Sequence, residues 1–196
     1  MTYPPRHFQD DNQERILALV EQAPLATILF GPENEQLNDA VYAPLIFDSS
    51  KQLFIGHIAA NNPLAQHQST VVKMLFQGPN GYLSPNHSDA LVVPTWLYAN
   101  AQLSGQFQMV NDYEQKLSMM NLITDHFERT FDRPWPVSAL DDAKRDTMFK
   151  HIEFFTVDVQ HWQGHFKLSQ NKPQRVREQI KQSLSNQGYK ELATLI

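Results

Sequence analysis

Residues 76–85 are Phe76-Gln77-Gly78-Pro79-Asn80-Gly81-Tyr82-Leu83-Ser84-Pro85, and after a short polar insert residues 92–98 are Val92-Val93-Pro94-Thr95-Trp96-Leu97-Tyr98. Both runs continue into apolar segments that predict strands. Between those segments, glycine and proline favour turns, while hydroxyls and aromatic rings are available to face a ligand. The stretch therefore predicts a pocket wall built largely from backbone, because a core alone rarely needs this mixture.

The length and composition of the chain limit its class. With 196 residues, 41% of them hydrophobic, the chain can build one substantial core, and we expect a single domain over residues 1–196. No apolar run approaches the roughly 18 residues that span a bilayer, and the start lacks the pattern of a signal peptide. We therefore expect a cytoplasmic protein without a membrane segment. The absence of cysteine excludes disulfides and thiolate chemistry.

Short apolar or alternating runs, bounded by glycine, proline or polar residues, predict the strands. They lie at Leu25–Phe30, Ala40–Phe47 with Pro44 marking an edge or bulge, Leu53–His57, Val71–Gln77, Thr95–Val110 with Gly105 as a bulge, and Ile152–Val159. Strands follow one another without a helix between each pair. The pattern therefore predicts six or so antiparallel strands closed into a barrel, rather than a parallel α/β sheet.

Capping residues followed by apolar stripes predict the helices. They cover about 11–22, Pro63 to about Gln68, about 112–128, Ser138 to about Lys150, and a basic segment from Pro173. We expect the apolar stripe of the helix at 112–128 to cover the sheet. Residues 173–196 should form a C-terminal helical extension. The predicted fold class is therefore mainly β with peripheral helices (α+β).

The central stretch also resembles the signature of a known family. Gly-Pro-x-x-Tyr-x-Ser-Pro, followed by Val-Val-Pro-Thr-Trp-x-Tyr, is similar to the motif of the PaiB family of FMN-binding negative transcriptional regulators. Further segments match in the same order: Tyr3-x-Pro5-x-His7-Phe8, Ala23-Pro24-Leu25-Ala26-Thr27, Gly56-His57-Ile58-Ala59, Arg133-Pro134-Trp135-x-Val137, and Trp162-x-Gly164-x-Phe166-Lys167-Leu168-Ser169-Gln170-Asn171. Together they cover nearly the whole chain.

The resemblance implies an FMN-binding split barrel, in which two protomers pack side by side and the flavin lies at the dimer interface. It implies these cofactor-binding residues: His57, Asn61, Tyr82, Ser84, Thr95, Trp96, Lys167, Ser169, Gln170 and Asn171. Rings such as Tyr82 and Trp96 would cover the flavin. Lys167 and the three hydrogen-bond donors that follow it within 167–171 would hold the phosphate.

Plainer interpretations of these residues stay open. Residues 167–171 also fit a solvated loop. The segment from Tyr82 to Trp96 also fits a packed turn at an interface. The His57 imidazole could simply bond to a backbone carbonyl. Two departures from the family remove polar groups: Ala60 replaces a basic residue, and Leu97 replaces an asparagine. Because a lost charged hydrogen bond weakens binding, we expect weak FMN binding, with cofactor lost on purification.

Other chemistries find little support in the sequence. His161 and His165 stand four apart, which would make a metal pair on a helix, but Val157–Trp162 has the pattern of a strand and Gly164 should break it, so we expect no metal site. Neither a Gly-x-Ser-x-Gly elbow nor a glycine-rich phosphate loop is present.

The charge of the chain bears on nucleic-acid binding. The net charge is −5 and the pI about 5.9, so DNA binding would need a local basic patch. The one candidate patch contains Lys172, Arg175, Arg177 and Lys181. A solvated charged face is the favoured explanation of this patch, and a weak DNA contact is the alternative.

Three functions stay open. The first is a homodimeric, FMN-binding split-barrel protein of PaiB type with a role as negative transcriptional regulator. The second is a flavin-dependent oxidoreductase, in which the flavin carries the redox chemistry and the protein supplies orientation and electrostatics. The third is a cofactor-free dimeric binding module that has lost FMN. A visible spectrum would separate the first two from the third, because bound oxidised flavin is yellow.

Overall fold

The computed structural model of the chain describes residues 4–31, 39–90 and 93–196. Tyr3 and Val92, named above, lie outside the described residues. The described residues form two compact units: unit 1 draws on the ranges 1–23, 76–102 and 162–196, and unit 2 on the ranges 24–75 and 103–161. Three long strands contribute to both units: β6 (Val71–Leu83), β7 (Thr95–Val110) and β8 (Ile152–Lys167). The single domain expected over residues 1–196 stays a prediction.

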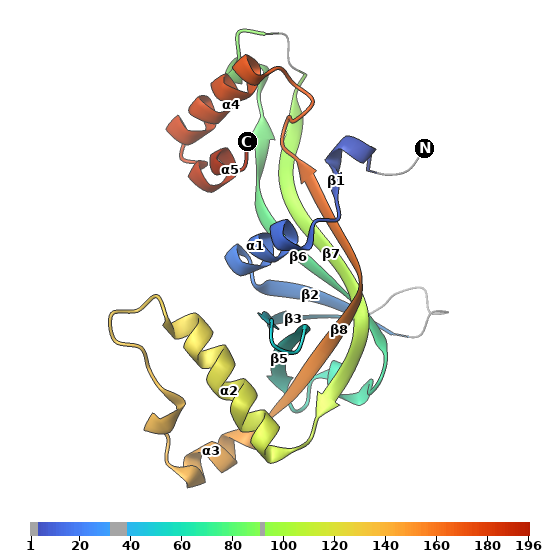
Figure 1. Cartoon of the computed structure of the whole chain (residues 1–196), viewed down its shortest axis with the longest axis vertical. Coiled ribbons are helices and arrows are strands. Elements are labelled where there is room, and N and C mark those ends of the chain that lie inside the picture. Colours follow the sequence, from blue (N-terminus) through green and yellow to red (C-terminus); the bar gives the residue numbers. More distant parts are fainter. Residues whose placement is uncertain (1–3, 32–38, 91–92) are drawn as a thin grey trace. The chain divides into compact units, whose positions relative to one another are not determined.

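The strands pair into one sheet, which confirms the predicted mainly β, α+β fold class. Its order is β3-β2-β6-β7-β8-β5-β4, and β1 pairs with β8 (Figure 1). The shorter strands are β1 (Gln9–Asp10), β2 (Leu25–Phe30), β3 (Asp39–Pro44), β4 (Ile46–Asp48) and β5 (Leu53–Ala59). The number of described strands exceeds the predicted six or so for two reasons. The two residues of β1 are too few to form a recognisable pattern, and the predicted strand Ala40–Phe47 is divided into β3 and β4.

Leu45 alone separates β3 from β4, although these strands stand at opposite ends of the sheet order. Pro44 ends β3, and the Leu45 amide then donates to the carbonyl of Pro24 at 2.9 Å. The Leu45 side chain is buried against Gly56, where a Cβ atom would lie 2.5 Å from it. The sheet therefore curls until its two ends are joined through one residue, as a split barrel requires.

β6 runs through the glycine- and proline-rich stretch that the sequence predicts as a turn. Its buried positions are even-numbered up to Gly78 and odd-numbered at Gly81 and Leu83. Side chains alternate faces along a strand, so this change of parity is what one extra residue, a β-bulge, produces. The predicted turn is therefore wrong: the chain stays extended, and residues 79–80 change which side chains face inward.

β7 is a single strand whose buried positions are odd-numbered from Leu97 to Phe107. The alternation is unbroken at Gly105, so the bulge predicted there is not found. A Cβ atom at Gly105 would lie 2.2 Å from the carbonyl oxygen of Asp158. This glycine is required because the backbones of β7 and β8 approach closely.

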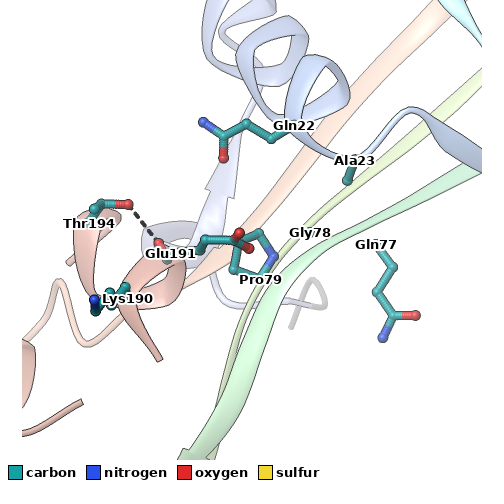
Figure 2. A pocket seen from close by; sticks show the side chains of 8 residues that line it. All are labelled: Gln22, Ala23, Gln77, Gly78, Pro79, Lys190, Glu191 and Thr194. Carbon is teal, nitrogen blue, oxygen red and sulfur yellow. Dashed lines mark hydrogen bonds between the residues drawn. The ribbon is translucent and has the colours of Figure 1, made fainter. Parts of the chain in front are cut away.

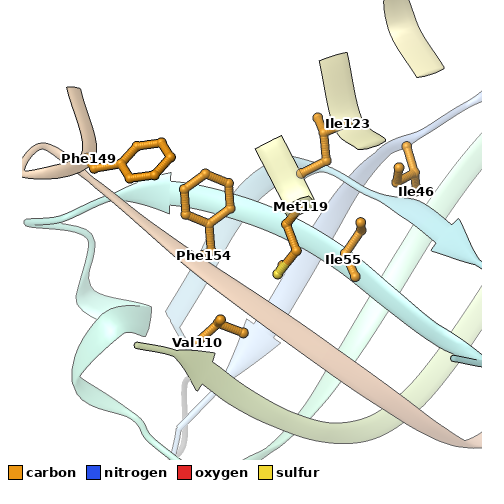
Figure 3. Close-up of a cluster of buried hydrophobic side chains, with 7 residues drawn as sticks. All are labelled: Ile46, Ile55, Val110, Met119, Ile123, Phe149 and Phe154. Carbon is orange, nitrogen blue, oxygen red and sulfur yellow. The ribbon is translucent and has the colours of Figure 1, made fainter. Parts of the chain in front are cut away.

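The core of unit 2 confirms that the helix predicted at 112–128 covers the sheet. This helix, α2 (Tyr113–Glu128), begins after Asp112, whose side chain accepts the amide of Gln115. It places Met119 and Ile123 against apolar side chains of the strands and of α3 (Figure 3). The cluster consists of Ile46, Ile55, Val110, Met119, Ile123, Phe149 and Phe154.

The remaining helices lie in the predicted segments with shifted boundaries, except for the 3₁₀ turns Arg6–Phe8 and Pro85–His87, which lie outside every predicted helix. They are α1 (Gln13–Gln22), α3 (Asp142–Phe149), α4 (Gln174–Asn186), α5 (Lys190–Thr194) and the 3₁₀ turns Arg6–Phe8, Pro63–Gln66, Pro85–His87 and Val137–Ala139. Asp141, rather than Ser138, caps α3 by accepting the amide of Lys144. No helix among the described residues is long and apolar enough to cross a membrane.

Candidate functional site

A cavity of about 240 Å³ lies in unit 1, where β7 begins and β8 ends. We call it the β7–β8 pocket. Its lining residues are Phe8, Leu83, Val93, Thr95, Leu97, Lys167, Ser169, Asn171 and Lys172. Leu83 and Leu97 are each 1% exposed and form its apolar, buried side. Four of the ten residues predicted to bind the cofactor are brought together here: Thr95, Lys167, Ser169 and Asn171.

A direct hydrogen bond joins two of these residues. The ammonium group Nζ of Lys167, at the last position of β8, donates to Oγ1 of Thr95, at the first position of β7, at 2.7 Å. The lysine is half-buried, and an ammonium group has three N–H donors. The bond to Thr95 therefore fixes the position of the cation while leaving donors for a ligand.

The turn after β8 shapes the other wall of the pocket. Ser169 has a φ of 61°, which is uncommon for a residue other than glycine, and its side chain is 5% exposed. The amide of Lys172 donates to the carbonyl of Ser169 at 2.9 Å and closes the turn. Ser169 and Lys172 are thus held next to each other at the pocket by backbone geometry.

Gln170, which was predicted to bind the phosphate, instead stabilises this turn. Its Oε1 accepts the amide of Leu168 at 2.8 Å, and its Nε2 donates to the carbonyls of His7, at 2.7 Å, and Phe166. Both polar atoms of the side chain are therefore engaged with backbone, and Gln170 is not among the lining residues. It acts on the pocket through the shape of the turn.

The chemistry of the pocket fits a phosphate group. Two lysines, two hydroxyls and one carboxamide supply donors, and no carboxylate is among the lining residues that the structure describes. Ammonium groups form charge-assisted bonds to phosphate oxygens, which are stronger than neutral ones. The volume lies below the roughly 300–1,000 Å³ of pockets that enclose a whole small ligand. The pocket therefore suits the phosphate end of FMN and not the entire molecule.

Tyr82 and Trp96, the predicted partners of the flavin ring, face away from this pocket. Leu83 and Thr95 line it, and side chains of successive strand residues point to opposite faces. On that other face the two rings lie 6.4 Å apart and are 47% and 53% exposed. The indole Nε1 of Trp96 donates to Oδ1 of Asn80 at 3.1 Å, which fixes the ring.

The other predicted residues have separate locations. Ser84 starts the 3₁₀ turn that follows β6, because its Oγ accepts the amide of Asn86 at 3.2 Å. His57 and Asn61 belong to unit 2. Burial lowers the pKa of His57 below its ordinary value, and among the described residues its Nδ1 has no hydrogen-bond partner. Asn61 is exposed in the turn after β5.

A larger cavity, of about 560 Å³, lies elsewhere in unit 1, between the end of α1, β6 and α5 (Figure 2). Its lining residues are Gln22, Ala23, Gln77, Gly78, Pro79, Lys190, Glu191 and Thr194. None of the predicted cofactor residues lines it, and its cation, Lys190, is accompanied by the carboxylate of Glu191. Size alone does not make a phosphate site, so we favour the smaller β7–β8 pocket.

Metal binding receives no support from the described residues, in which no group of three or more histidine, aspartate or glutamate side chains is placed to hold an ion. His161 and His165 both lie on β8, which continues through Gly164 rather than ending there as predicted. A Cβ atom at Gly164 would lie 2.8 Å from the carbonyl oxygen of Asp10, so this glycine permits β1 to pair with β8.

The sequence does not mark Lys172 as a pocket residue, because it stands two positions before the basic helix α4 and resembles the cations of that helix. In that predicted DNA-binding patch, Arg175 forms an ion pair with Asp89, and Arg177 donates to the backbone carbonyl of Ile196. Leu97, noted only as a departure from the family, lines the pocket as well. The patch is therefore weaker than its composition suggests.

The curled antiparallel sheet, with a phosphate-compatible pocket at its strand ends, defines a flavin-binding split barrel. Residues 2–161 match the model of the family described as "Putative FMN-binding domain". The chain belongs to this FMN-binding family, which confirms the resemblance to PaiB proteins, and FMN is its cofactor. The match ends before Lys167, so the polar half of the β7–β8 pocket lies beyond it.

Two kinds of relative support this assignment. The chain is 26% identical over 202 residues to the protease synthase and sporulation protein PAI 2 of Bacillus subtilis, covering 99% of this chain and 96% of that protein. Among solved structures, the FAD and heme binding protein of Mycobacterium smegmatis has a TM-score of 0.65 at 16% identity, over 88% and 78% of the two chains. The flavocytochrome Anf3 of Azotobacter vinelandii has a TM-score of 0.59 at 12% identity, over 84% and 72%. These structures share the fold.

Proposed function

We propose that this chain binds FMN with its phosphate in the β7–β8 pocket and acts as a flavin-binding regulator of PaiB type. The observation that carries the proposal is the hydrogen bond from Lys167 to Thr95 within a pocket that has two cations. Lys167, Thr95, Ser169 and Asn171 would hold the phosphate. Bound FMN supplies redox chemistry. The chain's own residues bind and orient it.

The location of Tyr82 and Trp96 supports a homodimer. The two rings are half-exposed on the face that a single protomer would not use for the phosphate. Aromatic residues of this kind are enriched in protein interfaces. In the proposed dimer, this surface is covered by the second protomer, and the flavin ring lies close to the interface.

The regulatory role rests on the similarity to PAI 2, whose name refers to protease synthesis and sporulation. We propose that DNA contact, if it contributes, is weak. Lys172 belongs to the pocket, and both arginines of the basic patch are engaged within the chain. A flavin-dependent oxidoreductase is the alternative, in which the bound flavin carries the redox chemistry and the protein supplies orientation and electrostatics.

The test is a titration of the purified protein with FMN, followed by its visible spectrum and fluorescence. The wild-type protein should bind, and Lys167→Gln should weaken binding about 10- to 150-fold, the value of a charge-assisted bond. Lys190→Gln, which removes a cation beside the larger cavity, serves as the matched control and should bind like wild type. Equal losses in both variants would argue for a general charge effect and against the pocket.

A further inference from the structure

Lys172 is the second cation of the β7–β8 pocket, and its position is defined by the turn rather than by the following helix. Its amide bonds to the carbonyl of Ser169, so Lys172 is fixed to the same turn that buries the Ser169 hydroxyl. The residue is half-buried and lines the pocket, and no carboxylate is among the described lining residues to compete with a ligand for its ammonium group. This ammonium group therefore remains available to a ligand.

The charge of the pocket matches one form of phosphate. At pH 7 a phosphate monoester carries about −1.5 to −2 charges, whereas each phosphate of a diphosphate diester carries about −1. Lys167 and Lys172 together supply two positive charges, and no acidic residue among the described lining residues reduces them. The two positive charges of the lysines match the charge of a monoester phosphate. A single lysine would be enough to match the charge of each phosphate in a diphosphate diester.

The size of the pocket favours a terminal group. Its volume is about 240 Å³, and its buried side is formed by Leu83 and Leu97. A diphosphate would carry a second phosphate and a nucleoside beyond the first, for which this cavity lacks room and further donors.

We propose that Lys172 makes this site selective for a terminal phosphate monoester, so that the protein prefers FMN to both FAD and riboflavin. The inference rests on the proposed binding of FMN in the β7–β8 pocket. It assigns Lys172 the task of distinguishing flavins, while Lys167 and Thr95 provide the common anchor. This selectivity differs from the solved relative of Mycobacterium smegmatis, which is described as binding FAD.

The experiment measures dissociation constants of FMN, FAD and riboflavin for the wild-type chain and three variants. Wild type should bind FMN at least about tenfold more tightly than FAD or riboflavin, the lower value for one charge-assisted bond. Lys172→Gln should lose about tenfold or more in FMN affinity while its riboflavin affinity stays within about twofold, which also shows that the pocket is folded. Lys172→Arg should retain the FMN preference. Lys181→Gln, which removes an exposed cation of α4 outside the pocket, should match wild type.

Each other outcome has a distinct meaning. FMN binding that is lost in Lys167→Gln but unchanged in Lys172→Gln would overturn the role of Lys172 and leave the proposed function standing. Equal affinity of the wild type for FMN and FAD would also overturn the selectivity. Failure of the wild type to bind any of the three flavins would overturn the proposed function and this inference with it.

Discussion

Thr95 and Trp96 are adjacent in the sequence, but β7 directs them to opposite faces: Thr95 bonds to Lys167 in the pocket, and Trp96 pairs with Tyr82 on the other side. One Pro-Thr-Trp motif therefore serves two surfaces. In the proposed binding mode, the phosphate of the flavin and the aromatic pair of the same protomer lie on different sides of the strand. This arrangement makes the oligomeric state of the protein an informative measurement.

We expect a homodimer at micromolar concentration, with a total interface above roughly 2,000 Å², the range of obligate dimers. Tyr82→Ser with Trp96→Ser removes the aromatic surface and should shift the equilibrium towards monomer. Light scattering coupled to gel filtration measures the mass of each species. Leu122→Ser, at an exposed apolar position of α2, is the matched control and should leave the oligomeric state unchanged. A wild-type protein that remains monomeric under these conditions would contradict the predicted dimer.

Gln170→Ala should destabilise the protein more than its location in a surface turn suggests. The substitution leaves the part-buried amide of Leu168 and carbonyl of Phe166 without their partner, and each unsatisfied buried group costs about 1–3 kcal/mol, whereas the exposed carbonyl of His7 can bond to water instead. Chemical denaturation measures the change in the free energy of unfolding. Gln182→Ala is the control, because Gln182 is exposed and bonds only to Asn186 in its own helix. A loss confined to FMN affinity, with stability unchanged, would instead assign Gln170 to the ligand.

Gly105→Ala should lower stability by about 1–3 kcal/mol, the cost of overpacking a tight site. The added methyl would lie 2.2 Å from the carbonyl oxygen of Asp158, and that backbone atom cannot move without separating β7 from β8. At Gly81 the nearest atoms are side-chain atoms of Leu192 and Tyr189, at 3.1 Å and beyond, so Gly81→Ala should cost much less. Thermal melts of both variants provide the comparison. Equal melting temperatures would show that the sheet adjusts freely at Gly105.

His57 should make the protein less stable in mild acid. Burial lowers the pKa of His57 below 6.5, so below that pH the unfolded chain binds more protons than the folded one. The free energy of unfolding should therefore fall as the pH drops below about 6.5, and level off once the folded state is protonated too. His57→Gln should reduce this fall. Proton titration by NMR that gives His57 a pKa at or above 6.5 would show that the ring is not desolvated.

DNA binding, where it is detected, should be weak and only moderately sensitive to salt. Even four phosphate contacts give a slope of only about −3.6 in a plot of log affinity against log salt concentration. Reversing the charge of Lys181 and Arg175 should remove it, because these are exposed cations of α4. Fluorescence anisotropy with duplex DNA over a range of salt concentrations measures both quantities. Nanomolar, sequence-specific binding that survives the substitutions would place the DNA surface elsewhere.

Much of the fold follows from local patterns in the sequence. The strand Leu25–Phe30 has the predicted bounds, and α2 at Tyr113–Glu128 lies within one residue of the predicted 112–128, because alternation and capping depend on neighbouring residues alone. The strand predicted to end at Gln77 continues to Leu83 for a physical reason. Glycine and proline are favoured in turns and in bulges alike, and only the pairing of β6 with its neighbours decides between them.

The site is less accessible to sequence reasoning than the fold. Thr95 and Lys167 are 72 positions apart and were named through a family motif, and the structure brings them within hydrogen-bond distance. Gln170, like its neighbours, has a side chain that can donate hydrogen bonds. The sequence alone cannot show that this side chain already donates to the backbone carbonyls of His7 and Phe166. Tyr82 changes face because of the bulge at residues 79–80, which no local pattern predicts.

The single-residue connection at Leu45 makes this part of the chain intolerant of changes in length. β3 and β4 are paired with different neighbours, so both registers are fixed on either side of one residue. Inserting or deleting a residue there would reverse the inward and outward faces of one of the two strands, since side chains alternate with a period of two. Relatives of this protein should therefore vary in length elsewhere, for example after Ala59, and keep the spacing from Ala43, which pairs with Ala26, to Ile46, which pairs with Ile55, wherever the barrel is preserved.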